Sequence, residues 1–150
     1  MTLEEIAKKM CARGKGILAA DESTGTIAKR FKSINVENTE KNRLIFRQTL
    51  FSSLAMKSCI GGVILFDETI KQKTTQGPSI PEMISKNGAV PGIKVDKGAK
   101  VLAGSSEETV TEGLDGLRER LKEYYNLGAR FTKWRAVYKI EEGLPTSQSI

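Results

Sequence analysis

The chain contains no histidine, and this absence restricts the chemistry that it can perform. Histidine is the commonest zinc ligand and the commonest general base near neutral pH. Acid–base chemistry in this chain must therefore use Lys, Asp, Glu or Tyr side chains. No EF-hand-like loop is present to bind a metal through oxygen ligands, so the sequence predicts no metal site.

Cysteines, aromatic residues and long hydrophobic runs are also scarce. Cys11 and Cys59 lie far apart and outside any CxxC motif, so we expect two buried thiols in a reducing compartment. Aromatic residues make up only 6% of the chain, which leaves few surfaces for stacking nucleic-acid bases. No apolar run approaches the ~20 residues that span a bilayer, and the N-terminus lacks the pattern of a secretory signal. We therefore expect a cytoplasmic protein without a membrane partner.

Basic residues are in excess: 24 Lys and Arg against 18 Asp and Glu give a net charge of +6 over 150 residues. Such a balance suits an anionic partner, either a nucleic acid or a phosphorylated small molecule. The cations are spread along the chain, and Trp134 is the single tryptophan. Both features disfavour nucleic acid, although a basic anion-binding or nucleic-acid-binding module remains an alternative.

Predicted helices and strands alternate along the chain. Thr2 and Glu5 have the spacing of a capping box, and they begin a helix that Gly14 ends. Apolar runs predict strands at residues 16–20, 62–66, 92–96 and 131–140. Further helices are predicted from Ser23 or Thr24, from Thr39, over 81–86, over 113–127, and opening at Thr146 or Ser147.

This alternation predicts an α/β fold with about four parallel strands joined by crossover helices. Two architectures fit the pattern, an open doubly wound sheet and a (β/α)8 TIM barrel. A complete barrel typically needs ~250 residues, so four strands in this chain correspond to half of one.

Charged residues interrupt or directly follow three of the predicted strands. Asp21 follows the first strand, Lys94 and Asp96 share one face of the third, and Lys133 and Arg135 share one face of the fourth. Each has a structural explanation by itself: Lys94 could pair with Asp96, and Asp21 could cap a helix. In a barrel, however, the carboxyl ends of the strands converge where active sites form. We therefore expect a cationic cluster opposite Asp21 that is suited to phosphate.

The segment from Ser23 to Thr26 places hydroxyl groups and Gly25 at the start of a helix, with Arg30 farther along. Backbone N–H groups and the helix dipole make such a helix start a natural anion site. An ordinary capped helix explains the same residues equally well.

Residues 18–30, LAADESTGTIAKR, resemble the first-strand signature of class I fructose-bisphosphate aldolases. Four more segments resemble that family in its order and spacing: CIGGVILF at 59–66, GIKVDKG at 92–98, GLDGL at 113–117 and KWR at 133–135. The resemblance extends over nearly the whole chain, from residue 14 to residue 150.

The resemblance implies a (β/α)8 barrel that reversibly cleaves fructose 1,6-bisphosphate to dihydroxyacetone phosphate and glyceraldehyde 3-phosphate. It implies a lysine Schiff base, no metal and no cofactor, and a phosphorylated sugar rather than a nucleic acid as partner. Residues 1–150 would be the N-terminal half of a single domain, truncated after the fourth strand. The Schiff-base lysine and the main glutamate base would then lie beyond residue 150, so we expect the isolated chain to be inactive. At full length the protein is expected to be a homo-oligomer.

The resemblance also assigns roles to individual residues. Asp21 matches the catalytic aspartate, Lys133 a lysine that assists the steps around the carbinolamine, and Lys94 a lysine that contacts substrate. Positions that bind substrate or its phosphates are matched by Ser23, Thr26, Arg30, Arg43 and Arg135. A different alternative is a half barrel without catalysis, whose open edge strands pair with another copy.

Overall fold

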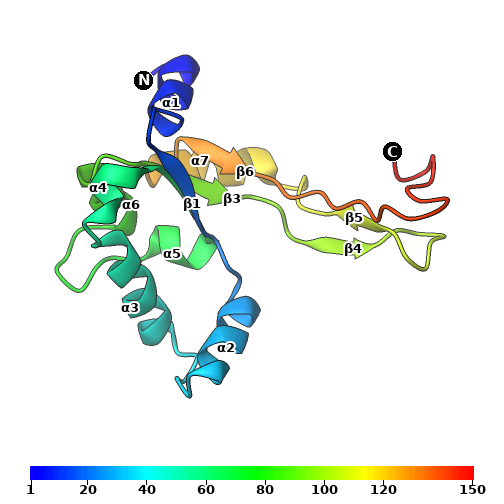
Figure 1. Cartoon of the computed structure of the whole chain (residues 1–150), viewed down its shortest axis with the longest axis horizontal. Coiled ribbons are helices and arrows are strands. Elements are labelled where there is room, and N and C mark those ends of the chain that lie inside the picture. Colours follow the sequence, from blue (N-terminus) through cyan, green and yellow to red (C-terminus); the bar gives the residue numbers. More distant parts are fainter.

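The computed structural model describes residues 1–150, which form one parallel sheet, one small hairpin and seven helices (Figure 1). The strands are β1 (Gly16–Ala20), β2 (Ile60–Leu65), β3 (Val90–Lys94), β4 (Ala99–Val101), β5 (Thr109–Thr111) and β6 (Phe131–Lys133). The helices are α1 (Leu3–Met10), α2 (Thr24–Ser33), α3 (Glu40–Phe51), α4 (Ala55–Cys59), α5 (Asp67–Lys71), α6 (Ile80–Lys86) and α7 (Leu117–Asn126).

The main sheet has the strand order β1-β2-β3-β6, and every neighbouring pair is parallel. Helices connect each strand to the next, so the predicted α/β fold with about four parallel strands is confirmed. This order places β1 and β6 at the two edges of the sheet, each with one side unpaired. No helix of the chain combines the length and the apolarity that crossing a bilayer requires.

Side-chain caps fix where several helices begin. Thr2 and Glu5 form a capping box at α1, as their spacing predicted. Ser23 caps α2 and Thr39 caps α3, each through a side-chain oxygen that accepts the backbone N–H three residues on. These local hydrogen bonds set the point at which the chain leaves β1 and enters α2, directly beside Asp21.

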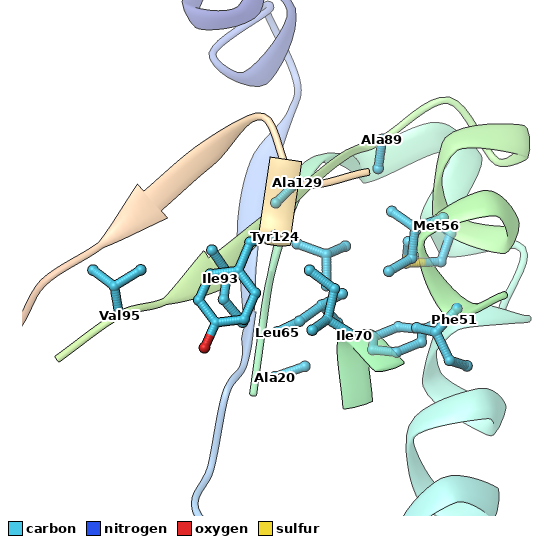
Figure 2. Close-up of a cluster of buried hydrophobic side chains, with 13 residues drawn as sticks. Ala20, Phe51, Met56, Leu65, Ile70, Ala89, Ile93, Val95, Tyr124 and Ala129 are labelled. Carbon is cyan, nitrogen blue, oxygen red and sulfur yellow. The ribbon is translucent and has the colours of Figure 1, made fainter. Parts of the chain in front are cut away.

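Helices α3 to α7 pack on one face of the sheet and form the hydrophobic core there (Figure 2). Alternate strand residues point into this core, because successive side chains of a strand face opposite sides. The strands contribute Ala20, Val63, Leu65 and Ile93, and the helices contribute Phe51, Met56, Ile70, Ile80, Ile84 and Tyr124. Core formation on this face leaves the opposite, concave face of the sheet without covering helices.

The uncovered face carries apolar residues near the amino ends of the strands and charged residues near their carboxyl ends. Ile17 on β1 remains 45% exposed there. The Phe131 ring of β6 lies across Gly62 and Gly92, and a Cβ atom at Gly92 would overlap this ring. Glycine at both positions therefore leaves room for the Phe131 ring of the edge strand β6 on the concave face of the sheet.

The predicted fourth strand over 131–140 is wrong in length, because β6 ends at Lys133. Its neighbour β3 ends at Lys94, so the sheet offers no backbone partner beyond that point. The chain instead runs along the β4–β5 hairpin, where the Thr111 hydroxyl donates to the carbonyl of Arg135 and Lys139 pairs with Glu107. The hairpin itself, which consists of two strands of three residues each, was not predicted.

Where a helix was predicted to open at Thr146 or Ser147, the chain forms one turn, in which the Thr146 carbonyl accepts the N–H groups of Ser149 and Ile150. Thr146 donates from its backbone N–H (2.9 Å) and its hydroxyl (2.7 Å) to the carboxylate of Glu108, a buried residue next to β5. These bonds fasten the end of the chain to the hairpin. Together, residues 99–112 and 134–150 form an arm that projects beyond the sheet (Figure 1).

Burial does not follow the apolar residues of the predicted helices everywhere. Leu3, Leu54 and Leu114 lie within or next to these helices, but they are 86%, 89% and 72% exposed. Both cysteines are exposed rather than buried. Periodicity identifies one face of a helix but does not establish that another element packs against it.

Candidate substrate-binding site

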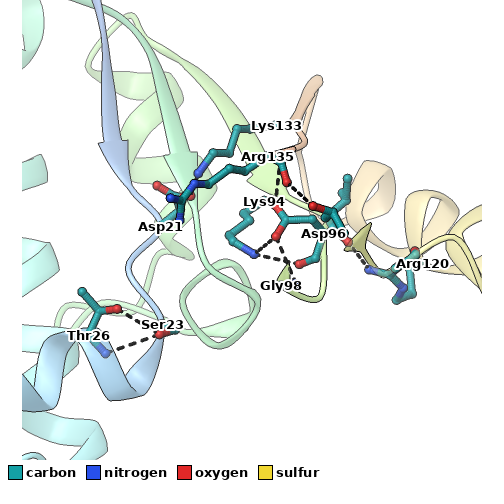
Figure 3. Close-up of polar contacts among 12 residues, drawn as sticks. Asp21, Ser23, Thr26, Lys94, Asp96, Gly98, Arg120, Lys133 and Arg135 are labelled. Carbon is teal, nitrogen blue, oxygen red and sulfur yellow. Dashed lines mark hydrogen bonds and ion pairs between the residues drawn. The ribbon is translucent and has the colours of Figure 1, made fainter. Parts of the chain in front are cut away.

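The carboxyl ends of β1, β3 and β6 meet at a cavity of about 840 Å³. Six of the eight predicted site residues line it: Asp21, Ser23, Thr26, Lys94, Lys133 and Arg135 (Figure 3). They come from three strand ends and the start of α2, which are far apart in the sequence. The cavity thus lies at the end of the sheet where active sites of (β/α)8 barrels form.

An ion pair joins the two edge strands across this cavity. The Lys133 ammonium donates a 2.6 Å hydrogen bond to the Asp21 carboxylate. Asp21 follows β1 and Lys133 ends β6, so two intervening strands separate them in the sheet. Their contact shows that the sheet curls strongly, as a segment of a barrel does.

A second ion pair, between Lys94 and Asp96, lies beside the first. The Lys94 ammonium donates to the Asp96 carboxylate and, at 2.8 Å, to the Asp96 backbone carbonyl. Asp96 also accepts the backbone N–H groups of Gly98 and Arg135, each at 3.2 Å. Burial acts to raise the pKa of Asp96, but the hydrogen bonds from Lys94 and the two amides outweigh it and hold the pKa below its ordinary value. Asp96 therefore positions both Lys94 and the backbone that carries Arg135.

Ser23 and Thr26 form the hydroxyl-lined rim of the cavity. The Ser23 hydroxyl accepts the Thr26 backbone N–H at 3.3 Å and lies 3.1 Å from the Thr26 hydroxyl. The capped-helix explanation is therefore correct, and the same residues also face the cavity. The start of α2 can stabilise an anion there through its free N–H groups and its dipole.

Arg30 and Arg43, the two remaining predicted residues, lie outside the cavity lining. Arg30 is exposed and pairs with Glu22. Arg43 is buried and donates from Nε (2.8 Å) and Nη2 (2.6 Å) to the Glu68 carboxylate, while Nη1 donates to Asn38. The Glu68 contact raises the pKa of Arg43 and lowers that of Glu68. In this conformation Arg43 joins α3 to α5, and the substrate-binding roles of both arginines stay predictions.

A second arginine of α3 supports the backbone next to Asp21. Arg47 is fully buried and donates from Nη2 to the backbone carbonyl of Glu22 at 2.6 Å. Its Nη1 lies 3.8 Å from the Glu68 carboxylate. Burial lowers the pKa of Arg47 from its ordinary value, against the opposing effect of the two glutamates. This contact fixes the turn that presents Asp21 to the cavity.

Several residues that line the cavity were not predicted from the sequence. Tyr124 lies in the helix predicted over 113–127, and its hydroxyl donates to Asp67 at 2.8 Å. Burial and this carboxylate together raise the pKa of Tyr124. Asp67 directly follows the end of the second strand, as Asp21 follows the first. The convergence of strand carboxyl ends, which singled out Asp21, could therefore also have identified Asp67. Arg120 reaches from α7 to the backbone carbonyl of Val95, and no sequence pattern indicates such a contact.

The assembled cavity can bind an anionic, hydroxyl-rich molecule. Three of its lysines, Lys71, Lys94 and Lys133, are paired with carboxylates and offer donors and acceptors within one site. The Arg135 guanidinium forms no ion pair. A guanidinium with free donors suits bidentate binding of phosphate. A curved parallel sheet with crossover helices and such a site at its carboxyl ends defines a protein of the (β/α)8-barrel class.

The chain belongs to the family of class I fructose-bisphosphate aldolases. The sequence profile of that family, Fructose-bisphosphate aldolase class-I, matches residues 2–150. This match covers every strand and helix described above, including the three strand ends that form the cavity.

Individual relatives agree with this membership. The chain is 57% identical to a probable fructose-bisphosphate aldolase class 1 from Xanthomonas axonopodis pv. citri, over 99% of this chain and 44% of the relative. It is also 57% identical to the cytosolic fructose-bisphosphate aldolase 5 of Arabidopsis thaliana, over 99% of this chain and 41% of the relative. The chain thus spans less than half the length of these relatives.

A solved structure confirms the fold. It contains fructose-bisphosphate aldolase from Plasmodium falciparum in complex with TRAP and a small molecule inhibitor. The likeness has a TM-score of 0.93 at 49% sequence identity and covers 97% of this chain and 42% of that one. Aldolases of this family are (β/α)8 barrels, so the four parallel strands of the chain correspond to half of a barrel.

Proposed function

We propose that this chain supplies the substrate-binding and assisting residues of a class I fructose-bisphosphate aldolase. The observation that carries the proposal is the Lys133–Asp21 ion pair, which lies beside Lys94 and Arg135 in one cavity of an aldolase-family chain. The complete enzyme would reversibly cleave fructose 1,6-bisphosphate to dihydroxyacetone phosphate and glyceraldehyde 3-phosphate.

The proposed reaction uses a lysine that forms a Schiff base with the substrate ketone. The resulting iminium accepts the electron pair that remains on C3 when the C3–C4 bond breaks. Asp21 would hydrogen-bond the reacting hydroxyl groups, Lys133 would assist proton transfers around the carbinolamine, and Lys94 would hold the substrate. The 2.6 Å Lys133–Asp21 contact supports the first two roles, because proton transfer requires donor and acceptor within hydrogen-bonding distance.

The substrate phosphates would bind at the edges of the cavity. Arg135 has a guanidinium without an ion pair, and Ser23 and Thr26 lie at the start of α2. Arg30 and Arg43 would join them only after leaving Glu22 and Glu68, their partners in this conformation.

Residues 1–150 would form the N-terminal half of a single barrel domain, truncated after the fourth strand, and the Schiff-base lysine would lie outside them. We therefore propose that the 150-residue chain alone is inactive, and that the full-length protein is a cytoplasmic homo-oligomer that uses no cofactor. The cytosolic Arabidopsis relative supports the location.

Borohydride trapping tests the absence of the nucleophile. The chain would be incubated with dihydroxyacetone phosphate and sodium borohydride, and its mass measured, with a full-length aldolase as positive control. We expect labelling of the control alone. Covalent labelling of this chain would identify a nucleophile within residues 1–150 and contradict the proposal.

Nuclear magnetic resonance tests the binding role separately. Titrating the ¹⁵N-labelled chain with fructose 1,6-bisphosphate should shift the amide signals of Thr26, Gly98 and Arg135, whereas fructose should not. K133M should weaken this binding, and K122M, on the exposed surface of α7, should leave it unchanged. Equal binding by both variants would refute the assignment of the site.

A further inference from the structure

Five side chains of alternating charge form a row beside the candidate site. In order along the row they are Arg30, Glu22, Arg47, Glu68 and Arg43. Glu22 lines the cavity, and the last three residues of the row lie on α3 and α5. A ligand in the cavity can therefore act on the buried part of the row through Glu22.

Arg47 is a fully buried cation whose hydrogen-bonding groups are only partly used. Its Nη2 donates to the backbone carbonyl of Glu22 at 2.6 Å, but Nε and Nη1 donate to no atom of the chain. The carboxylates of Glu22 and Glu68 lie 4.0 and 3.8 Å from its guanidinium, beyond hydrogen-bonding distance. A buried charge without a close partner destabilises a fold, so a carboxylate that moved nearer would stabilise Arg47.

Of the two glutamates, Glu22 is the one that can approach Arg47. Both carboxylate oxygens of Glu68 accept hydrogen bonds from Arg43, at 2.8 and 2.6 Å. In Glu22, Oε1 accepts from Arg30, whereas Oε2 is buried and accepts no hydrogen bond. A shift of about 1 Å would bring Oε2 within hydrogen-bonding distance of Arg47 Nη2. The unpaired atoms are enclosed by residues of this chain, so their pairing does not depend on the rest of a barrel.

Arg30 lies well inside α2, but its guanidinium reaches back to the start of that helix. Its partner Glu22 directly precedes the cap residue Ser23, and helical side chains tilt toward the N-terminus, which permits this contact. The guanidinium therefore lies close to Ser23 and Thr26, where the proposed function places a phosphate (Figure 3). An ion pair with an exposed arginine is weak, whereas a phosphate can accept two hydrogen bonds from one guanidinium. A phosphate at the helix start can thus draw Arg30 away from Glu22.

We propose that phosphate binding at the start of α2 exchanges the ion-pair partner of Glu22. Arg30 leaves Glu22 for the phosphate, and the Glu22 carboxylate turns to Arg47. The exchange replaces one ion pair with two, Arg30 with phosphate and Glu22 with Arg47. It rests on the proposed function for the presence of a phosphate at this site, and it adds the step that releases Arg30. Arg47 is then a positioning residue, because it acts through Glu22 and does not touch the ligand.

The exchange makes phosphate binding depend jointly on Arg47 and on the Glu22 side chain. Without Arg47, the departure of Arg30 would leave the largely buried Glu22 carboxylate uncompensated, so Glu22 would retain Arg30. The hydrogen bond from Arg47 to the Glu22 backbone carbonyl is a different contribution, because it does not involve the Glu22 side chain. Replacing that side chain therefore separates the exchange from structural support of the backbone.

Titration with inorganic phosphate, followed by the amide signals of the ¹⁵N-labelled chain, tests the exchange in a double-mutant cycle. R47M should weaken phosphate binding about tenfold, the lower bound for a hydrogen bond to a charged group. In the E22Q background the same change should alter the affinity by less than about twofold, because no carboxylate then restrains Arg30. A tenfold loss in both backgrounds would show that Arg47 acts only through the Glu22 carbonyl, and would overturn the exchange. A wild-type chain that binds no phosphate would overturn it as well.

K32M is the matched control on α2. Lys32 is exposed, forms no ion pair and lies two residues beyond Arg30, so the two side chains do not share a helix face. It should leave the phosphate affinity unchanged. If R47M does not fold, the side-chain Nε–H signal of Arg47 provides the test without replacing that residue. Phosphate should shift this signal in the wild type and not in E22Q, and an unshifted signal in the wild type would overturn the exchange.

Fructose 1,6-bisphosphate separates a failure of the exchange from a failure of the proposed function. If the cycle behaves as expected with phosphate but the sugar bisphosphate binds no more tightly than phosphate, the exchange stands and the assignment of the sugar substrate fails. If the sugar bisphosphate binds the wild type, E22Q, R47M and the double variant with equal affinity, the exchange is wrong and the proposed substrate site stands.

Discussion

Glu68 is the carboxylate on which two buried cations of α3 depend. It accepts two hydrogen bonds from Arg43 and lies 3.8 Å from Arg47, whose side chain is fully buried. Removing one partner of a buried pair leaves the other charge uncompensated, which costs more than the pair itself contributes. The stability of the α3–α5 contact therefore depends on the ionisation of one glutamate.

We expect E68Q to lower the free energy of unfolding by about 3 kcal/mol at pH 7, because the amide cannot neutralise either arginine. Urea unfolding followed by circular dichroism measures the change. E142Q is the matched control, since Glu142 is exposed and forms no ion pair, and it should change stability by less than about 0.5 kcal/mol. Equal stability of the two variants would show that the buried arginines do not need Glu68.

The effect of E68Q should also depend on pH in a defined direction. Arg43 lowers the pKa of Glu68 from its ordinary value of 4.5 in the folded state. The stabilisation is therefore fully present above pH 4.5 and is lost as the pH falls through the folded-state pKa. Wild type and E68Q should converge in stability there, and a constant difference down to low pH would contradict the assigned ion pair.

At the scale of secondary structure, the end of α1 packs directly on β2. A Cβ atom at Gly61 would overlap the backbone carbonyl of Met10, which cannot move without displacing the helix. Gly61 is therefore required by a contact between two backbones rather than by a turn. Gly61 is the second residue of β2, and the rest of this strand has the apolar sequence of an ordinary buried strand.

We expect G61A to destabilise the chain by about 2–3 kcal/mol, through displacement of α1 from β2. G25A is a matched change on α2, where no atom lies within 4 Å of the added methyl, and it should stabilise the chain by about 0.5 kcal/mol. Thermal unfolding of both variants provides the comparison. A neutral G61A would indicate that α1 is not held against β2 in solution.

Local sequence patterns predicted most elements of the sheet but not their ends. The cap at Ser23 and the strand over Gly16–Ala20 depend on neighbouring residues, so they could be predicted. The end of β6 at Lys133 depends on where its neighbour β3 stops, which no local pattern encodes. The β4–β5 hairpin was not predicted for the same reason: no local sequence pattern encodes it.

The candidate site, like the sheet, could be predicted from the sequence only in part. The rule that carboxyl ends of parallel strands converge was sufficient to bring Asp21, Lys94 and Lys133 together. It could not predict that Asp96 holds the backbone of Arg135, or that Tyr124 donates to Asp67, 57 residues away. Such contacts depend on how α7 docks and where the arm leaves the sheet.

For the whole molecule, the net charge of +6 raised two possibilities, a nucleic acid or a phosphorylated small molecule. In the folded chain many cations are engaged by nearby carboxylates, among them Lys71, Lys94, Lys133 and Lys139. The cavity-lining cations without an ion pair are only Lys97, Arg120 and Arg135, which do not form an extended basic track. A single site of this kind favours a small phosphorylated ligand over a polymer that needs many phosphate contacts.

The proposed half-barrel site should become catalytic when the remaining strands are supplied. Mixing the chain with a polypeptide that contains the rest of the Xanthomonas relative should give cleavage of fructose 1,6-bisphosphate, which neither part shows alone. K133M in the chain should reduce this activity at least about 100-fold, because a residue that assists proton transfer contributes that much or more. K122M is the control and should keep full activity.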